Sequence, residues 1–99
     1  MEDLSTFSGR VRWLVEASGR GLAPLSRAAG LGPSLLGHYA RGTRDNPERD
    51  SVEALSRLFG CKPGWLAFGE GVEPSADFVR TKVAEALALA SSAPATEAA

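Results

Sequence analysis

The sequence predicts a compact all-α domain built from short helices. A chain of 99 residues has the length of one small domain around a single core. No stretch alternates apolar and polar residues in the manner of a strand, and isoleucine is absent. Glycine and proline recur at the spacing at which short helices end and begin. A hydrophobic content of 43% with 23% charged residues is typical of folded proteins.

Three helices are expected in the first half of the chain, over residues 8–17, 24–29 and 33–40. A serine can cap the first helix. A proline opens each of the other two, because a proline in the first turn gives up no amide donor that the helix needs. The starting residues are Ser8, Pro24 and Pro33, and the glycines that follow the helices are Gly19, Gly30 and Gly42.

Three more helices are expected in the second half, over residues 50–59, 63–68 and 77–90. Asp50 or Ser51 can cap the fourth helix, and Pro63 opens the fifth. Residues 92–99 are small and polar and are expected to form a disordered tail. The chain then divides into an N-terminal arm, a main domain, a C-terminal helix and the tail, over residues 1–7, 8–71, 72–91 and 92–99.

The content of cysteine and histidine excludes several classes of protein. Cys61 is the only cysteine and His38 the only histidine, so neither an internal disulfide nor a Cys/His zinc site can form. We expect no metal and no cofactor, and Cys61 is expected to act as a small buried apolar residue. The start is acidic and no apolar run is long enough for a membrane span, which predicts a cytoplasmic protein without membrane contact.

Charge is distributed unevenly along the chain, although the net charge is only -1. Residues 9–44 hold six arginines against Glu16 alone, a balance of +5. Residues 63–99 have a balance of -3. The positive half is therefore where an anionic partner is expected. Arg10, Arg12 and Arg20 are expected to be solvated or to make auxiliary phosphate contacts.

The second and third expected helices have the pattern of a helix-turn-helix unit. Ser26 is small where the two helices must approach closely, and Gly30 occupies the turn, where a positive φ is needed. Leu25, Leu31 and Leu36 are expected to point inward and to fix the crossing of the helices.

The segments His38-Tyr-Ala-Arg-Gly42, Asn46-Pro47, Val52–Gly60 and Pro63-Gly-Trp-Leu-Ala-Phe-Gly-Glu-Gly71 resemble the phage repressor and Cro (XRE-type, lambda-repressor-like) family. The resemblance covers about residues 8–71. It implies a five-helix lambda-repressor-like helix-turn-helix domain, here with an additional C-terminal helix. It also implies a sequence-specific DNA-binding regulator of the repressor type, with double-stranded DNA as partner.

The resemblance implies that the third helix enters the major groove. The positions that it turns toward the base edges are Gly32, Pro33, Ser34, Leu35 and His38. Ser34 can bond either base type, Leu35 can touch a thymine methyl, and His38 can donate to a purine acceptor. The positions expected on phosphates are Arg27, Arg41 and Arg44.

The chain departs from the family pattern at the sites of the strongest DNA contacts. It has no glutamine, which family members commonly carry at the start of the second helix to bond the DNA backbone. Ala40 stands where the family usually has glutamate, and Gly32 where it usually has serine. The third helix has no Arg, Lys, Asn or Gln before Arg41. We therefore expect modest direct readout, with specificity partly from DNA shape and dimer spacing.

The sixth expected helix carries an apolar stripe that can either pack back on the domain or pair with another chain. We expect it to contribute to a homodimer, or to contact a protein partner, because occupying two half-sites raises affinity for DNA. The residues assigned to this role are Phe78, Val79, Val83 and Leu87.

The two tryptophans are expected to have different surroundings. Trp65 should be core, pinning the fifth helix to the first and fourth. Trp13 falls beside the apolar stripe of the first helix and is open between contact with a partner and contact with the C-terminal helix. An enzyme is not expected, because no set of nucleophile, base and orienting group is present. The alternatives to a repressor are an adaptor or antirepressor that has lost DNA binding, and an antitoxin whose C-terminal helix folds onto a toxin.

Overall fold

The computed structural model describes residues 4–32, 34–43 and 47–98 of the chain. The described residues form six α-helices and no strand. The all-helical prediction is therefore confirmed. The helices in chain order are α1 (Phe7–Ser18), α2 (Leu22–Ala29), α3 (Leu35–Arg41), α4 (Arg49–Phe59), α5 (Pro63–Phe68) and α6 (Ala76–Ala98).

Several helices begin a residue or two away from the predicted start. Thr6, not Ser8, caps α1: its backbone is extended, and its hydroxyl accepts from the Gly9 amide at 3.0 Å. The fourth helix is preceded by Glu48, whose side chain makes no capping hydrogen bond, rather than by Asp50 or Ser51. Pro24 lies in the first turn of α2 but is not its first residue. Proline is tolerated there because none of the first four amides of a helix has a hydrogen-bond partner within the helix.

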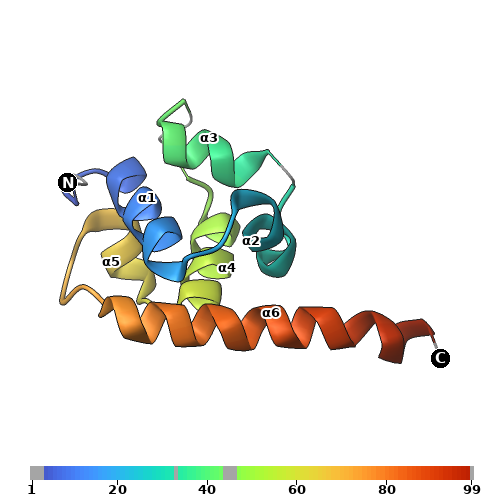
Figure 1. Ribbon diagram of the computed structural model, residues 1–99. Coiled ribbons are helices and arrows are strands. Elements are labelled where there is room, and N and C mark those ends of the chain that lie inside the picture. The colour runs from blue at the N-terminus through green and yellow to red at the C-terminus, as the bar shows by residue number, and fades with distance from the viewer. Residues whose placement is uncertain (1–3, 33, 44–46, 99) are drawn as a thin grey trace.

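The core lies between α1, α4 and α6, with α5 closing one side (Figure 1). The long helix α6 runs along the base of the molecule and packs against α1, α4 and α2. Val79 and Val83 are fully buried there. The apolar stripe of α6 thus packs on its own domain, which corrects the assignment of these two valines to a dimer or partner surface.

The helix α3 lies at the opposite end of the molecule from α6 (Figure 1). Its inner face packs on α1 and α2. Leu36 and Tyr39 are fully buried, and the Tyr39 ring meets Phe7 of α1 edge to face with the centroids 5.2 Å apart. This packing leaves the other face of α3 directed away from the body.

The connection between α2 and α3 agrees with the expected burial and backbone conformation in several details. Leu25, Ser26 and Leu36 are fully buried, Leu31 is half-buried against the core, and Gly30 has a φ of 76°. The close approach expected at Ser26 agrees with its complete burial. The structure begins α3 at Leu35, later than the sequence predicts, while Pro33 lies outside the described residues.

The backbone of α6 continues to Ala98, well past the predicted end at residue 90. The segment that composition assigned to a disordered tail is therefore helical as far as Ala98. Alanine is frequent there and has the highest helix propensity, which favours a helical backbone. The C-terminal part of α6 extends beyond the other helices (Figure 1).

Candidate nucleic-acid interface

The two faces of α3 differ sharply in character. Its buried residues are Leu36, Gly37, Tyr39 and Ala40. Its outward residues are polar: Ser34 and Arg41 are exposed, and His38 is half-buried. This division follows the helical repeat, because the outward positions lie three or four residues apart. The outward face can therefore offer hydrogen-bonding groups and positive charge to a partner.

The five positions assigned to base edges are not equivalent in the structure. Gly32 is exposed in the turn before α3, and Ser34 is exposed at the position that directly precedes the helix. Leu35 is half-buried and packs against the core, so only part of its side chain is open to a partner. His38 lies one turn further along the outward face. Pro33 lies outside the described residues.

The arginines assigned to phosphates flank this face. Arg27 is exposed in the last turn of α2, and Arg41 is exposed at the end of α3. The Arg41 guanidinium folds back over the preceding turn: a Cβ placed on Gly37 would lie 3.1 Å from its Nη1 atom. Gly37 therefore leaves room for the guanidinium beside the helix. Arg44 lies outside the described residues.

A tight turn closes α3 and joins it to the residue that follows. Gly42 has a φ of 80°, a left-handed conformation that glycine adopts without steric cost. The Gly42 amide donates to the Tyr39 carbonyl at 3.2 Å and the Thr43 amide to the His38 carbonyl at 3.1 Å. The turn brings the Thr43 hydroxyl to 2.9 Å from Nδ1 of His38 and 3.2 Å from the His38 carbonyl.

Arg12 of α1 also stabilises this end of α3, a role that the sequence does not predict. Its Nη1 donates to the Ala40 carbonyl at 2.6 Å. A positive group at the carbonyl end of a helix is favourable, both as a hydrogen-bond donor and because of the helix dipole. The contact joins residues that are 28 positions apart, so only the fold brings them together.

Arg10 contradicts the expectation of a solvated charge or phosphate contact. It is 3% exposed and donates to three backbone carbonyls: Nε to Leu66 at 2.8 Å, Nη1 to Leu4 at 2.8 Å and Nη2 to Ala67 at 3.0 Å. Burial lowers the pKa of its guanidinium. Arg10 thus ties α1 to the end of α5 and is removed from the positive surface.

The two tryptophans pair between α1 and α5. Trp65 is buried, as predicted, and Trp13 is half-buried with its ring centroid 6.2 Å from that of Trp65 in an edge-to-face arrangement. Trp13 therefore packs mainly within its own chain. The sequence analysis expected contact with a partner or with the C-terminal helix, whereas the ring that Trp13 meets belongs to Trp65 of α5.

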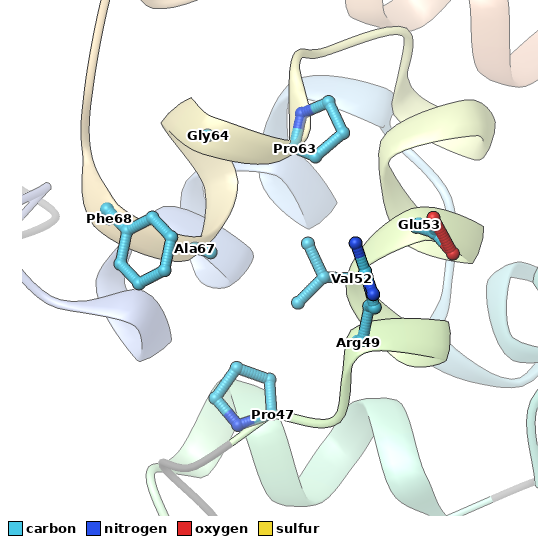
Figure 2. A pocket seen from close by; sticks show the side chains of 8 residues that line it. All are labelled: Pro47, Arg49, Val52, Glu53, Pro63, Gly64, Ala67 and Phe68. Atoms are coloured by element: carbon cyan, nitrogen blue, oxygen red, sulfur yellow. The ribbon is translucent and has the colours of Figure 1, made fainter.

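An open groove of about 820 Å³ lies between α4 and α5 (Figure 2). Pro47, Val52, Pro63 and Ala67 contribute to its apolar lining, and Phe68 stands at its edge with 75% of its surface exposed. No motif in the sequence indicates this groove. Phe68 thus adds an exposed aromatic side chain beside the apolar lining of the groove.

Cys61 lies between α4 and α5 and is half-buried against the core. Burial raises the pKa of its thiol to about 11. The thiol therefore stays protonated at neutral pH and is a poor nucleophile. This agrees with the apolar packing role expected for the residue.

Within the described residues, no group of three or more His, Cys, Asp or Glu side chains is placed to hold a metal ion. In the same part of the chain, no helix combines the length and the apolar character that a membrane crossing requires. Comparison of the chain with protein-family models, with curated proteins and with solved structures finds no match.

Proposed function

We propose that the protein is a sequence-specific DNA-binding transcriptional regulator of the repressor type, which inserts α3 into the major groove. The observation that carries the proposal is the outward face of α3, which is polar and bears Arg41; among the described residues, the helices that pack on α3 are α1 and α2, on its inner side. The preceding helix α2 packs on the inner side with its own arginine at the surface. A protruding helix flanked by arginines fits both requirements of DNA recognition, base edges and phosphates.

The roles divide between the polar and the charged residues. Ser34 and His38 face the base edges, where each can form a hydrogen bond. Arg27 and Arg41 contact phosphates, which fixes the register and supplies affinity that depends on salt. Burial of Arg10 lowers the number of arginines available for phosphates, so the salt dependence is smaller than the sequence alone suggests.

A selection from random double-stranded DNA, followed by fluorescence anisotropy over a range of salt concentrations, tests the proposal. A repressor enriches defined sites, and its affinity falls with salt by a log-log slope of about 0.9 per phosphate neutralised. Arg41→Ala should weaken binding evenly across sequences and reduce the slope by about 1, whereas Ser34→Ala should change preference at individual positions. Failure to enrich any site, with no salt dependence, would refute the proposal.

A homodimer on two half-sites about 34 Å apart remains part of the proposal. With Val79 and Val83 in the core, the residues of the α6 stripe left for such contacts are Phe78, which is 48% exposed, and Leu87, which is half-buried. Sedimentation velocity of the chain, alone and with the selected DNA, tests this. A single protein copy on the selected site would exclude the dimer.

A second candidate is a protein-interaction module that does not bind DNA, such as an adaptor or an antirepressor. The groove between α4 and α5 and the exposed Phe68 favour it. The same selection separates the two candidates, because an interaction module enriches no DNA. Phe68→Ala then serves as the control: it should leave DNA binding by a repressor unchanged.

A further inference from the structure

The Thr43 hydroxyl has a single proton but two polar neighbours at the end of α3. One is the His38 carbonyl oxygen at 3.2 Å, and the other is Nδ1 of the His38 ring at 2.9 Å. A carbonyl oxygen can only accept, so the 3.2 Å contact is a hydrogen bond only when the hydroxyl proton points to the carbonyl, and this is the arrangement that we take. The hydroxyl oxygen is then left with lone pairs toward Nδ1, and Nδ1 must carry a proton to bond it.

This chain of hydrogen bonds decides how the ring meets a partner. A neutral imidazole has one ring proton, so a proton on Nδ1 leaves Nε2 with a lone pair. Nδ1 is turned toward Thr43, and Nε2, across the ring, makes no hydrogen bond with any residue of the described segments. His38 is half-buried on the outward face of α3, where a base edge would lie if the proposed function holds.

We propose that Thr43 sets the proton of His38 on Nδ1, so that His38 presents a hydrogen-bond acceptor and selects a base with an exocyclic amino group. In the major groove these groups are N6 of adenine and N4 of cytosine. Guanine and thymine present O6 and O4 instead, and these oxygens would face a lone pair. The polarity is the reverse of the one expected from the sequence, in which His38 donates to a purine acceptor. The base-reading step rests on the proposed function, whereas the proton position does not.

Thr43 acts here as a positioning residue, because it reaches the base only through His38. The turn at Gly42 makes this possible, since its left-handed conformation folds Thr43 back over the last turn of α3. Thr43→Val removes the hydroxyl and keeps the shape of the side chain. Thr43→Ser keeps the hydroxyl and serves as the matched control.

The position of the proton can be measured without DNA. His38 is the only histidine of the chain, so ¹⁵N-correlated NMR of a protein without added histidines gives its two ring nitrogens unambiguously. Well above the pH range in which imidazole titrates, Nδ1 should have the shift of a protonated nitrogen in the unmodified chain and in Thr43→Ser. Thr43→Val should move the proton toward Nε2. The same proton position in all three proteins, or a proton on Nε2 in the unmodified chain, would overturn the proposal.

The base preference is measured by DNA selection with the same three proteins, at the position that loses its preference in His38→Ala. The unmodified chain and Thr43→Ser should favour adenine or cytosine by about two- to tenfold, the range that one net hydrogen bond provides. Thr43→Val should lose or reverse this preference. Identical profiles for Thr43→Val and the unmodified chain would refute base selection. A chain that selects no DNA at all would refute it together with the proposed function, while the nitrogen shifts would still decide where the proton lies.

Discussion

The helices α3 and α5 are built alike and used differently. Each is short, each ends at a glycine with positive φ, and each has backbone carbonyls near its end bonded by an arginine of α1. The α5 partner, Arg10, is buried and bonds two carbonyls of α5 as well as that of Leu4, whereas the α3 partner, Arg12, is half-buried and bonds the Ala40 carbonyl. An arginine of α1 that bonds carbonyls near the end of a helix thus anchors α5 in the core and supports α3 at the surface.

The surroundings of the two helices account for this difference. Trp65 and Leu66 place α5 against the core, and Trp13 of α1 meets Trp65. In α3 only the inner face packs against the core. The outward side chains, those of Ser34, His38 and Arg41, end in polar groups that water can solvate. A short helix with a polar outer face and a firm anchor is suited to contact a partner without losing its own position.

The largest effect that tests this comparison comes from the two arginines of α1. Arg10→Ala should lower the free energy of unfolding by about 4 kcal/mol, because it removes charged hydrogen bonds to three carbonyls and leaves those near the core without donors. Arg12→Ala should cost about 1 to 2 kcal/mol, because its site is more open to water. Chemical denaturation measures both values. Equal losses would contradict the distinction between a buried and a surface anchor.

Leucine substitutions measure how each helix is anchored. Leu66 of α5 and Leu36 of α3 are both fully buried, so replacing either with alanine should cost about 3 kcal/mol. Leu35, at the edge of the outward face, is half-buried, and Leu35→Ala should cost only about 1 kcal/mol. The values again come from denaturation. A loss for Leu35→Ala as large as for Leu36→Ala would mean that α3 has no free face.

The two terminal glycines sharpen the comparison at the level of single atoms. Gly69 and Gly42 both have positive φ, but a Cβ at Gly69 would lie 3.1 Å from Nη1 of the buried Arg10, and one at Gly42 3.3 Å from the hydroxyl of Ser8. Arg10 is held by three bonds, whereas a serine hydroxyl can rotate. We expect Gly69→Ala to cost about 2 kcal/mol and Gly42→Ala about 1 kcal/mol in unfolding experiments. The opposite order would show that the Arg10 guanidinium moves easily to make room for a Cβ at Gly69.

The smallest expected effect concerns pH near the start of α5. The pKa of the Cys61 thiol is raised to about 11, so the folded chain holds this proton more tightly than the unfolded chain does. The stabilisation is complete below the ordinary thiol pKa and is lost as the pH rises toward 11. Because the side chain is only half-buried, we expect a loss of about 1 kcal/mol beyond that seen in Cys61→Ala. Parallel stability curves for the two proteins between neutral and strongly alkaline pH would exclude the effect.

Much of the local structure could be predicted because its causes are local. Gly19, Gly30 and Gly42 each follow a helix, as the sequence indicates, because glycine adopts the left-handed conformation that ends a helix without steric cost. Leu25, Leu36 and Trp65 could be assigned to the core from their spacing. Helix starts were less predictable, because Thr6 and Ser8, or Glu48 and Asp50, compete at neighbouring positions.

The candidate site could be predicted only in outline. The outward positions of α3 follow from helical spacing, but the partial burial of Leu35 depends on how closely α3 approaches its neighbours. The roles of Arg10 and Arg12 could not be predicted either, because they depend on which segments meet in the fold. An arginine on a helix looks the same in sequence whether it meets water or the carbonyls of a segment 56 residues away, as Arg10 does.

The amino-acid sequence by itself determined that this chain is all-helical, where the first five helices end, and which face of α3 is polar, because propensity, glycine conformation and helical repeat act within a few residues. Only the tertiary structure decided that Val79 and Val83 complete the core, that Arg10 is buried while Arg41 is exposed, and that Thr43 meets the ring of His38. Burial and hydrogen-bond partnership depend on which segments meet in space. Those meetings are set by the packing of the whole chain rather than by any one segment.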